Sequence, residues 1–303
     1  MKKKRKSSLS RIRVNDAIWG YICIAPLAIG LIIFLAAPLL YSLYISLTEY
    51  DLFSKPVFIG LDNFRRAFSA SETQFWPSIK NALVMSIGVI ISMFLSLVLA
   101  NILTKKLKGM NAFKLIFFIP TICSPVAVAI MWRRMYDYNY GTINKILKTL
   151  FHMEPVNWLS REWAVPSLIF MGVLFGMGIN ILLYISAIKN IPSVYYEAAK
   201  LDGANELQSF LRITVPSVSP VTFYILITGL IGSLQGFTTF KVMTNGSPEN
   251  TMMPVMLIYN YSGNDYGAFY GYASALAILL GLIISVIMII NFKLSKKWVY
   301  YES

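Results

Sequence analysis

A polar stretch from Ile191 to Ser217 combines residue types that suit contact with a second protein. Glu197 can form a charged contact, either with a partner or with a helix end. Small side chains at Ala198, Ala199 and Gly203 let another surface approach closely. On these grounds alone, the stretch is either a docking site or an amphipathic connector that packs on its own helix ends.

The same stretch has the local signals of two short helices separated by a glycine. Alanines favour the first helix, Gly203 interrupts it, and Asp202 is a suitable N-cap for a second helix over Ala204–Ile213. Pro216 and Pro220 then stop or bend the chain. We therefore predict a compact helix–glycine–helix knob.

Polar and aromatic side chains within apolar segments predict a different site, one for a neutral polar solute. These segments contain no ionisable residue that could pair with a charged solute or relay protons. Amides can hydrogen-bond to hydroxyl groups, although each candidate could instead form an interhelical hydrogen bond or anchor the chain at the interface. The candidates are Asn180, Tyr184, Tyr224, Gln235 and Phe237.

Other chemistries lack the residues that they need. The sequence has no G-x-x-x-x-G-K-[ST] loop to hold nucleotide phosphates. Cys23 and Cys123 fall in apolar runs, where a disulfide or a metal site is implausible, and His152 has no partner at metal-ligand spacing. We predict no catalytic residue, no metal and no cofactor bound by this chain.

Six apolar runs must position these residues. Hydrophobic residues make up 56% of the 303 positions and charged residues 14%, against about 25% charged in a typical soluble domain. A helix of about 20 apolar residues crosses a membrane. The third run is short and contains Pro120 and Pro125, which allow a break. The predicted spans are Ala17–Leu47, Ala82–Leu103, Leu115–Met131, Ala164–Ile188, Ser217–Phe240 and Gly267–Phe292.

Charge predicts the orientation of these spans. Of the 27 Lys and Arg residues, 17 fall in the N-terminal segment, the second and fourth connections and the C-terminus. Because basic loops stay in the cytoplasm, both termini and residues 191–217 are predicted to be cytoplasmic. The net charge of +13 is thus explained without nucleic-acid binding. We expect a cytoplasmic segment 1–16, a membrane domain 17–292 and a cytoplasmic tail 293–303.

The polar stretch resembles the signature of binding-protein-dependent ABC importer permeases: EAA, three residues, G, nine residues, I, one residue, then L-P. Glu197-Ala198-Ala199, Gly203, Ile213 and Pro216 match at this spacing, with Val215 in place of the usual Leu. Asn245–Pro248 departs from the usual Gly-Gly-Pro. Further phrases resemble the carbohydrate-uptake branch, of the maltose and glycerol-3-phosphate permease type: FIGLDNF (Phe58–Phe64), YGTIN (Tyr140–Asn144), Gly178-Ile179-Asn180, SLQGF (Ser233–Phe237) and YGYASALA (Tyr270–Ala277).

The resemblance implies an all-α type I ABC importer permease with six transmembrane helices in the bacterial cytoplasmic (inner) membrane. Its expected partners are a second homologous permease subunit, two cytoplasmic ATPase subunits that use ATP and Mg, an extracytoplasmic solute-binding protein, and membrane lipid. The chain would import a sugar or oligosaccharide by alternating access, with residues 191–217 as the coupling loop. An ion-coupled secondary transporter of a neutral solute, an ABC permease for a non-sugar polar solute, and a membrane receptor or scaffold are the alternatives.

Overall fold

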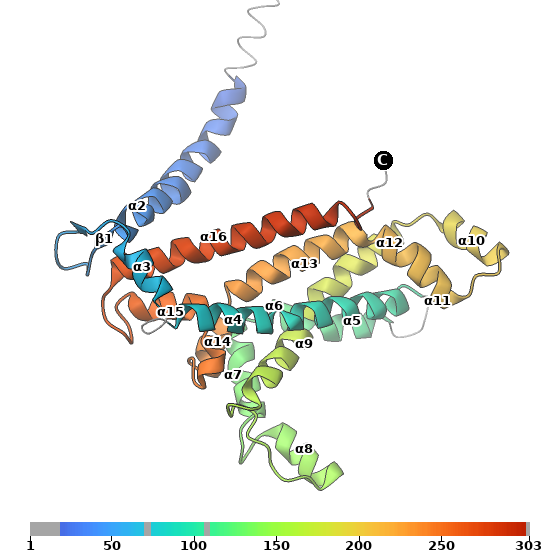
Figure 1. Cartoon of the computed structure of the whole chain (residues 1–303). Helices are drawn as coiled ribbons and strands as arrows, with labels where there is room; N and C mark the ends of the chain where they lie inside the picture. The colour runs from blue at the N-terminus through green and yellow to red at the C-terminus, as the bar shows by residue number, and fades with distance from the viewer. Residues whose placement is uncertain (1–18, 70–73, 106–109, 301–303) are drawn as a thin grey trace, which may run out of the picture.

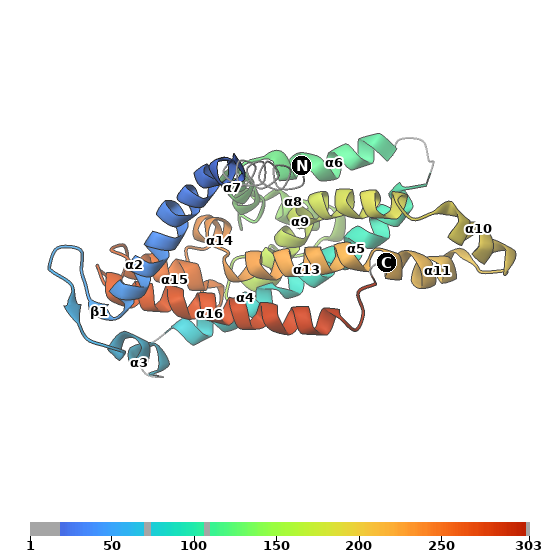
Figure 2. The ribbon, with the colours of Figure 1, turned by 90° about the horizontal axis from the view of Figure 1, so that it is seen from above.

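The computed structural model describes residues 19–69, 74–105 and 110–300, which are mostly helical. The predicted segment 1–16, the start of the first span at Ala17 and the last residues of the tail, 301–303, lie outside the described residues. Figure 1 shows long helices that run side by side between two ends of the molecule. One end carries the C-terminus with α10 (Ser193–Leu201) and α11 (Glu206–Ser209), and Figure 2 shows the same arrangement from above.

Four long helices have the length and composition to cross a membrane. They span Trp19–Ser46, Phe75–Leu103, Ala164–Lys189 and Tyr270–Ser295. Two bent pairs of helices raise the number of candidate spans in the described chain to six. The predicted runs therefore correspond to helical segments, although several of them begin or end elsewhere.

The first span stands apart from the other helices. It includes a π-helical turn, η1 (Ile32–Ala36), and α2 (Ala37–Ser46). In Figure 1 it projects away from the bundle, and none of its most apolar 18-residue window is buried within the described chain. Its last residues, Ile45 and Ser46, are buried against the rest of the protein.

The bundle is built around α5 (Ile87–Leu103) and α9 (Ala164–Lys189), which pack along each other. The helix α4 (Phe75–Met85) leads directly into α5. The helix α13 (Ser219–Leu234) contacts both α5 and α9, and α16 (Tyr270–Ser295) contacts α13 and α2. Burial of apolar side chains from α5, α9 and α13 in one cluster holds this centre together.

The predicted break in the third run is confirmed. The helices α6 (Met110–Ile122) and α7 (Pro125–Met135) meet at an angle of 111°. Pro125 occupies the first turn of α7, where its missing N–H costs no hydrogen bond. Pro120 lies inside α6, two residues before its end. The Leu115–Met131 run is thus two short helices rather than one straight span.

The predicted Ser217–Phe240 run ends earlier than expected. Its helix, α13, ends at Leu234, and Gln235 is the C-cap. A separate helix, α14 (Thr238–Met243), follows after a short connection. The apolar sequence continues through Phe240, but the residues after the break form α14, which packs against α7. Hydropathy alone therefore overestimates the length of this span.

Short elements complete the described chain. The strands β1 (Thr48–Glu49) and β2 (Val57–Phe58) form an antiparallel pair. The remaining elements in the described ranges are α3 (Asp62–Phe68), α8 (Thr142–Phe151), η3 (Glu249–Thr251) and α15 (Pro254–Tyr261), with α12 (Val215–Ser217) and η2 (Phe210–Thr214) at the α10 end.

Two glycines allow close contact between helices. A Cβ atom at Gly178 of α9 would collide with the carbonyl oxygen of Phe117 in α6. A Cβ atom at Gly229 of α13 would collide with the side chain of Val89 in α5. Small residues at helix crossings let backbones approach, as membrane helix packing requires.

Candidate functional site

The helix–glycine–helix knob forms as predicted in outline, and Gly203 has a definite backbone role. Gly203 has φ +79°, a left-handed conformation that favours glycine. Its N–H donates to the carbonyl of Lys200, and the N–H of Ala204 donates to the carbonyl of Ala199. This pair of hydrogen bonds is a Schellman motif, which ends α10 and turns the chain sharply.

The predicted N-cap of the second helix is wrong. Asp202 is instead the C-cap of α10, and Asn205 caps α11. The Asn205 side chain accepts a hydrogen bond from the Gln208 N–H, and the Gln208 side chain accepts one from the Asn205 N–H. This reciprocal capping box satisfies two N–H groups, whereas Asp202 is occupied in ending the preceding helix.

The surface of the knob is exposed. None of the nine residues of α10, all of them in the described chain, is buried, and Glu197 and Ala198 are exposed. Leu201 is 89% exposed and Leu207 64% exposed, although both are large apolar side chains. Exposed apolar side chains on a polar knob mark a surface that another protein can cover.

A cavity of about 370 Å³ separates α10 from the segment that follows it. Four of the seven predicted coupling residues line it, namely Ala199, Asp202, Gly203 and Ile213, whereas Glu197, Ala198 and Pro216 lie elsewhere on the knob and its base. The polar side chains of Asp202, Gln208, Ser209 and Arg212 contribute to its lining.

Several contacts fix the knob to the bundle. The Tyr196 and Thr214 hydroxyls lie 2.9 Å apart, which joins α10 to η2. At the start of α11, Lys105 Nζ donates a hydrogen bond to Glu206 Oε2 at 2.7 Å. This hydrogen bond lowers the pKa of the Glu206 carboxyl. The contact between Lys105 and Glu206 therefore contributes its full stabilisation above the ordinary pKa of a glutamate. This contribution is lost as the pH falls through the lowered pKa of Glu206.

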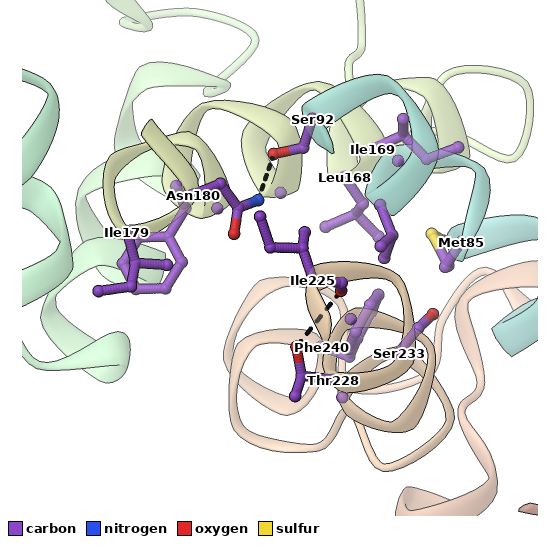
Figure 3. A pocket seen from close by; sticks show the side chains of 17 residues that line it. Met85, Ser92, Leu168, Ile169, Ile179, Asn180, Ile225, Thr228, Ser233 and Phe240 are labelled. Carbon is purple, nitrogen blue, oxygen red and sulfur yellow. Dashed lines mark hydrogen bonds between the residues drawn. The ribbon is translucent and has the colours of Figure 1, made fainter. Parts of the chain in front are cut away.

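A central cavity of about 450 Å³ lies between α5, α9 and α13. Its described lining contains no ionisable residue; its polar groups are Ser92, Asn180, Thr228 and Ser233. Asn180 Nδ2 donates a hydrogen bond to Ser92 Oγ at 3.4 Å, and Figure 3 shows these two side chains pointing toward each other. The cavity can therefore offer amide and hydroxyl groups to a neutral ligand.

Glycines and one aromatic ring shape this cavity. Gly88, Gly172, Gly176, Gly229 and Gly232 contribute to its wall. A Cβ atom built at Gly172 or Gly232 would meet no described atom within 4 Å, so these two positions border open space. Phe240 of α14 also lines the cavity.

Of the five predicted solute-binding residues, Asn180 lines the central cavity and the other four lie elsewhere. Tyr184 is fully buried, and its hydroxyl donates to Thr222 Oγ1 at 3.1 Å. Tyr224 is 57% exposed. Gln235 is exposed at the end of α13, and Phe237 packs on Tyr259 with 5.0 Å between ring centroids.

Ser92, Thr228 and Ser233 were missed because their sequence signal is weak. Hydroxyl side chains are common in membrane helices, where they bond to the backbone of the preceding turn. Thr228 does so, donating to the carbonyl of Tyr224 at 2.8 Å. Met85, Gly88 and Ser92 are spaced three and four residues apart, so the sequence could have indicated that they share one face of the continuous helix α4–α5. Only the packing of the helices shows that this face borders the cavity.

Known proteins with similar sequences and structures are membrane permeases. The "Probable ABC transporter permease protein YesP" of Bacillus subtilis is 36% identical over 97% of this chain and 96% of its own length. The "Trehalose/maltose transport system permease protein MalF" of Thermococcus litoralis is 32% identical, with 95% and 97% covered. A chain of a bacterial ABC transporter involved in import of the acidic polysaccharide alginate superposes with a TM-score of 0.81 at 26% identity, over 94% of this chain and 97% of that one.

The family model described as "Binding-protein-dependent transport system inner membrane component" matches residues 67–300. The matched region contains the knob, the central cavity and every helix after the first span except α3. The chain therefore belongs to this family and is a multi-pass membrane permease of an ABC transport system.

Proposed function

We propose that the chain forms half of the translocation pathway for a sugar or oligosaccharide in an ATP-driven importer. The observation that carries this proposal is the uncharged cavity, in which Asn180 and three hydroxyl side chains face a space of about 450 Å³. Neutral solutes with many hydroxyl groups suit such a lining. Support also comes from relatives named for trehalose/maltose and for arabinooligosaccharide transport, which are 32% and 31% identical to this chain.

Asn180 and Gln235 provide a matched test of the solute site. We expect Asn180→Ala to weaken sugar binding roughly fivefold, because the loss of one hydrogen bond costs about 1 kcal/mol. Gln235→Leu should leave affinity unchanged, since Gln235 lies outside the cavity lining. Equilibrium dialysis of a labelled oligosaccharide against the assembled importer, without binding protein, measures both. Two results would assign Asn180 to helix packing. One is an equal effect of Asn180→Ala and Gln235→Leu on sugar affinity, and the other is an Asn180→Ala variant whose thermal unfolding midpoint falls while its sugar affinity is unchanged.

The knob is the proposed coupling element. Two cytoplasmic ATPase subunits would bind ATP and Mg, and the knob would fit a cleft on one of them and transmit its motion during alternating access. Its exposed helix, its stiff Schellman turn and its exposed leucines support this role. The proposed coupling residues are Glu197, Ala198, Ala199, Asp202, Gly203, Ile213 and Pro216.

The exposed first span supports pairing with a second permease subunit. Trp19–Ser46 offers a long apolar surface that the described chain leaves uncovered, with open space at Gly20 and Gly30. A homologous permease can cover part of it, and lipid the rest. An extracytoplasmic binding protein would deliver the solute to the opposite end from the knob.

We further propose six spans with both termini in the cytoplasm. Tyr300, in the C-terminal tail, donates its N–H to Ser219 Oγ beside the knob, so the described part of the tail and the knob share one end. A membrane-impermeant thiol reagent on intact cells should label Phe53→Cys, which is 89% exposed as phenylalanine, but not Leu207→Cys. The background is a variant in which Cys23 and Cys123 are replaced. Labelling at Leu207→Cys but not at Phe53→Cys would show that the topology is the reverse of the one proposed.

A further inference from the structure

The helix α8 has an apolar face that the described chain covers only in part. Ile143, Ile146, Leu147, Leu150 and Phe151 recur at helical spacing on one side. Ile143 packs against a core cluster, but Ile146 is 48%, Leu150 68% and Phe151 64% exposed. Figure 1 shows α8 lying beyond the N-terminal end of α9, away from the bundle. The helix is therefore amphipathic, and most of its apolar face has no cover in the described chain.

The opposite side of α8 is polar and basic. Lys145 and Lys148 are exposed there, together with Thr142 and Thr149. A helix with lysines on one face and large apolar side chains on the other suits the boundary between headgroups and acyl chains. The ammonium groups also complement anionic headgroups, which attract basic residues near the surface.

The position of α8 along the membrane normal follows from its neighbours. It lies in the connection between α7, which ends at Met135, and α9, which begins at Ala164. A row of aromatic rings joins these elements: Trp132, Tyr136, Trp158 and Trp163 follow one another with centroids 5.4 Å, 6.0 Å and 5.7 Å apart, and Trp163, directly before α9, is 45% exposed. Tryptophan and tyrosine gather at membrane–water interfaces. The exposed Trp163 and the start of the α9 span thus place α8 beside the end of a membrane-spanning helix, where an interface is expected.

Asn144 fixes α8 to this aromatic row. Its side chain is buried, and its Nδ2 donates to the carbonyls of Tyr138 and Val156 at 3.1 Å and 3.0 Å. Its Oδ1 accepts from Trp158 Nε1 at 2.9 Å and from the Val156 N–H at 3.1 Å. These bonds set the orientation of the helix, so its exposed apolar face is held in one direction rather than left to rotate.

We propose that α8 lies in the outer headgroup region of the bilayer, with Ile146, Leu150 and Phe151 in the acyl boundary and Lys145 and Lys148 at anionic phospholipid headgroups. This inference rests on the proposed topology, which puts α8 on the extracytoplasmic side. It adds a lipid-binding surface that is separate from the solute pathway and from the coupling knob.

Collision accessibility of spin labels tests this placement. The assembled importer, with Cys23 and Cys123 replaced, is reconstituted in vesicles of phosphatidylethanolamine and phosphatidylglycerol. Labels are attached at Ile146→Cys and Leu150→Cys, with Thr149→Cys as the control on the polar side. We expect oxygen, which dissolves in lipid, to reach the first two labels more readily than a water-soluble nickel chelate, and the reverse at Thr149→Cys. Nickel access at all three positions would overturn the proposal. So would loss of access to both reagents at 146 and 150, which would indicate a protein partner.

Substitutions of Lys145 and Lys148 provide a second test of the placement. In the same vesicles, Lys145→Gln and Lys148→Gln should each raise the nickel-accessible fraction of the Leu150→Cys label about fivefold. An unchanged fraction would exclude the headgroup contact. ATP-driven uptake by the same vesicles separates the two claims: uptake with water-exposed labels refutes only the placement of α8, whereas lipid-exposed labels without uptake refute only the proposed function.

Discussion

Ala198→Leu is expected to reduce ATP-driven uptake strongly while the chain still folds and inserts. Ala198 is exposed on α10, and leucine is nearly as good a helix former as alanine, so the change should cost the isolated subunit little. In a fitted contact with an ATPase, the added bulk should cost about 1–3 kcal/mol, or roughly one to two decades in the binding constant. Co-purification of the ATPase and its stimulation by loaded binding protein measure the loss.

Thr149→Leu is the control for this experiment, because it adds similar bulk at an exposed position of α8, on the other side of the protein. Its uptake should match that of the unmodified chain. If Ala198→Leu keeps normal assembly, stimulated hydrolysis and uptake, the knob is only a connector at the membrane surface.

Gly203 is a less direct probe of docking than its place in the signature suggests. A Cβ atom there meets no described atom within 4 Å, so added bulk alone does not disturb the subunit. The φ of +79°, however, makes leucine strained by about 1–2 kcal/mol. Asparagine tolerates this conformation better. Gly203→Leu thus combines backbone strain with bulk, whereas Gly203→Asn mainly adds a side chain.

The second large effect is expected from Gly172→Trp, which should block transport without uncoupling hydrolysis. Gly172 borders the central cavity of about 450 Å³, and its Cβ position is open. An indole ring there would occupy a large part of the space that the solute needs. We expect uptake to fall at least about tenfold, while loaded binding protein still stimulates ATP hydrolysis, because the knob is untouched.

Gly281→Trp is the matched control for the blocked cavity. Gly281 is a helical glycine of α16 with an open Cβ position, and it lies outside the cavity lining. Near-normal uptake in this variant would show that a tryptophan in a span is tolerated. Full uptake with Gly172→Trp would mean that solute does not pass through this cavity.

Properties that depend on composition and local pattern could be predicted from the sequence. Apolar runs located the membrane helices, and Pro120 and Pro125 indicated the break between α6 and α7. The spacing of Glu197 and Gly203 located the knob. Such features follow from burial in lipid and from backbone preferences, which act over a few residues.

Properties that depend on packing could not be predicted in the same way. A helix that is apolar on all sides gives no periodic signal for the face that borders a cavity, so Tyr184 and Tyr224 were as plausible as Asn180. The side of α9 on which Tyr184 lies is buried against α13, where Thr222 satisfies its hydroxyl. Similarly, both Asp202 and Asn205 suit an N-cap, and the Schellman turn at Gly203 decides which of them precedes α11.

The most direct test of the central claim is ATP-driven uptake by the complete importer in proteoliposomes. The chain is reconstituted with a second permease subunit and two ATPase subunits, and binding protein loaded with a labelled oligosaccharide is added outside. We predict accumulation of the sugar inside that requires both ATP and binding protein and continues after an ionophore has collapsed all ion gradients. Accumulation that follows an ion gradient and ignores ATP, or ATP-driven accumulation of a non-sugar solute with none of any sugar tested, would contradict the account.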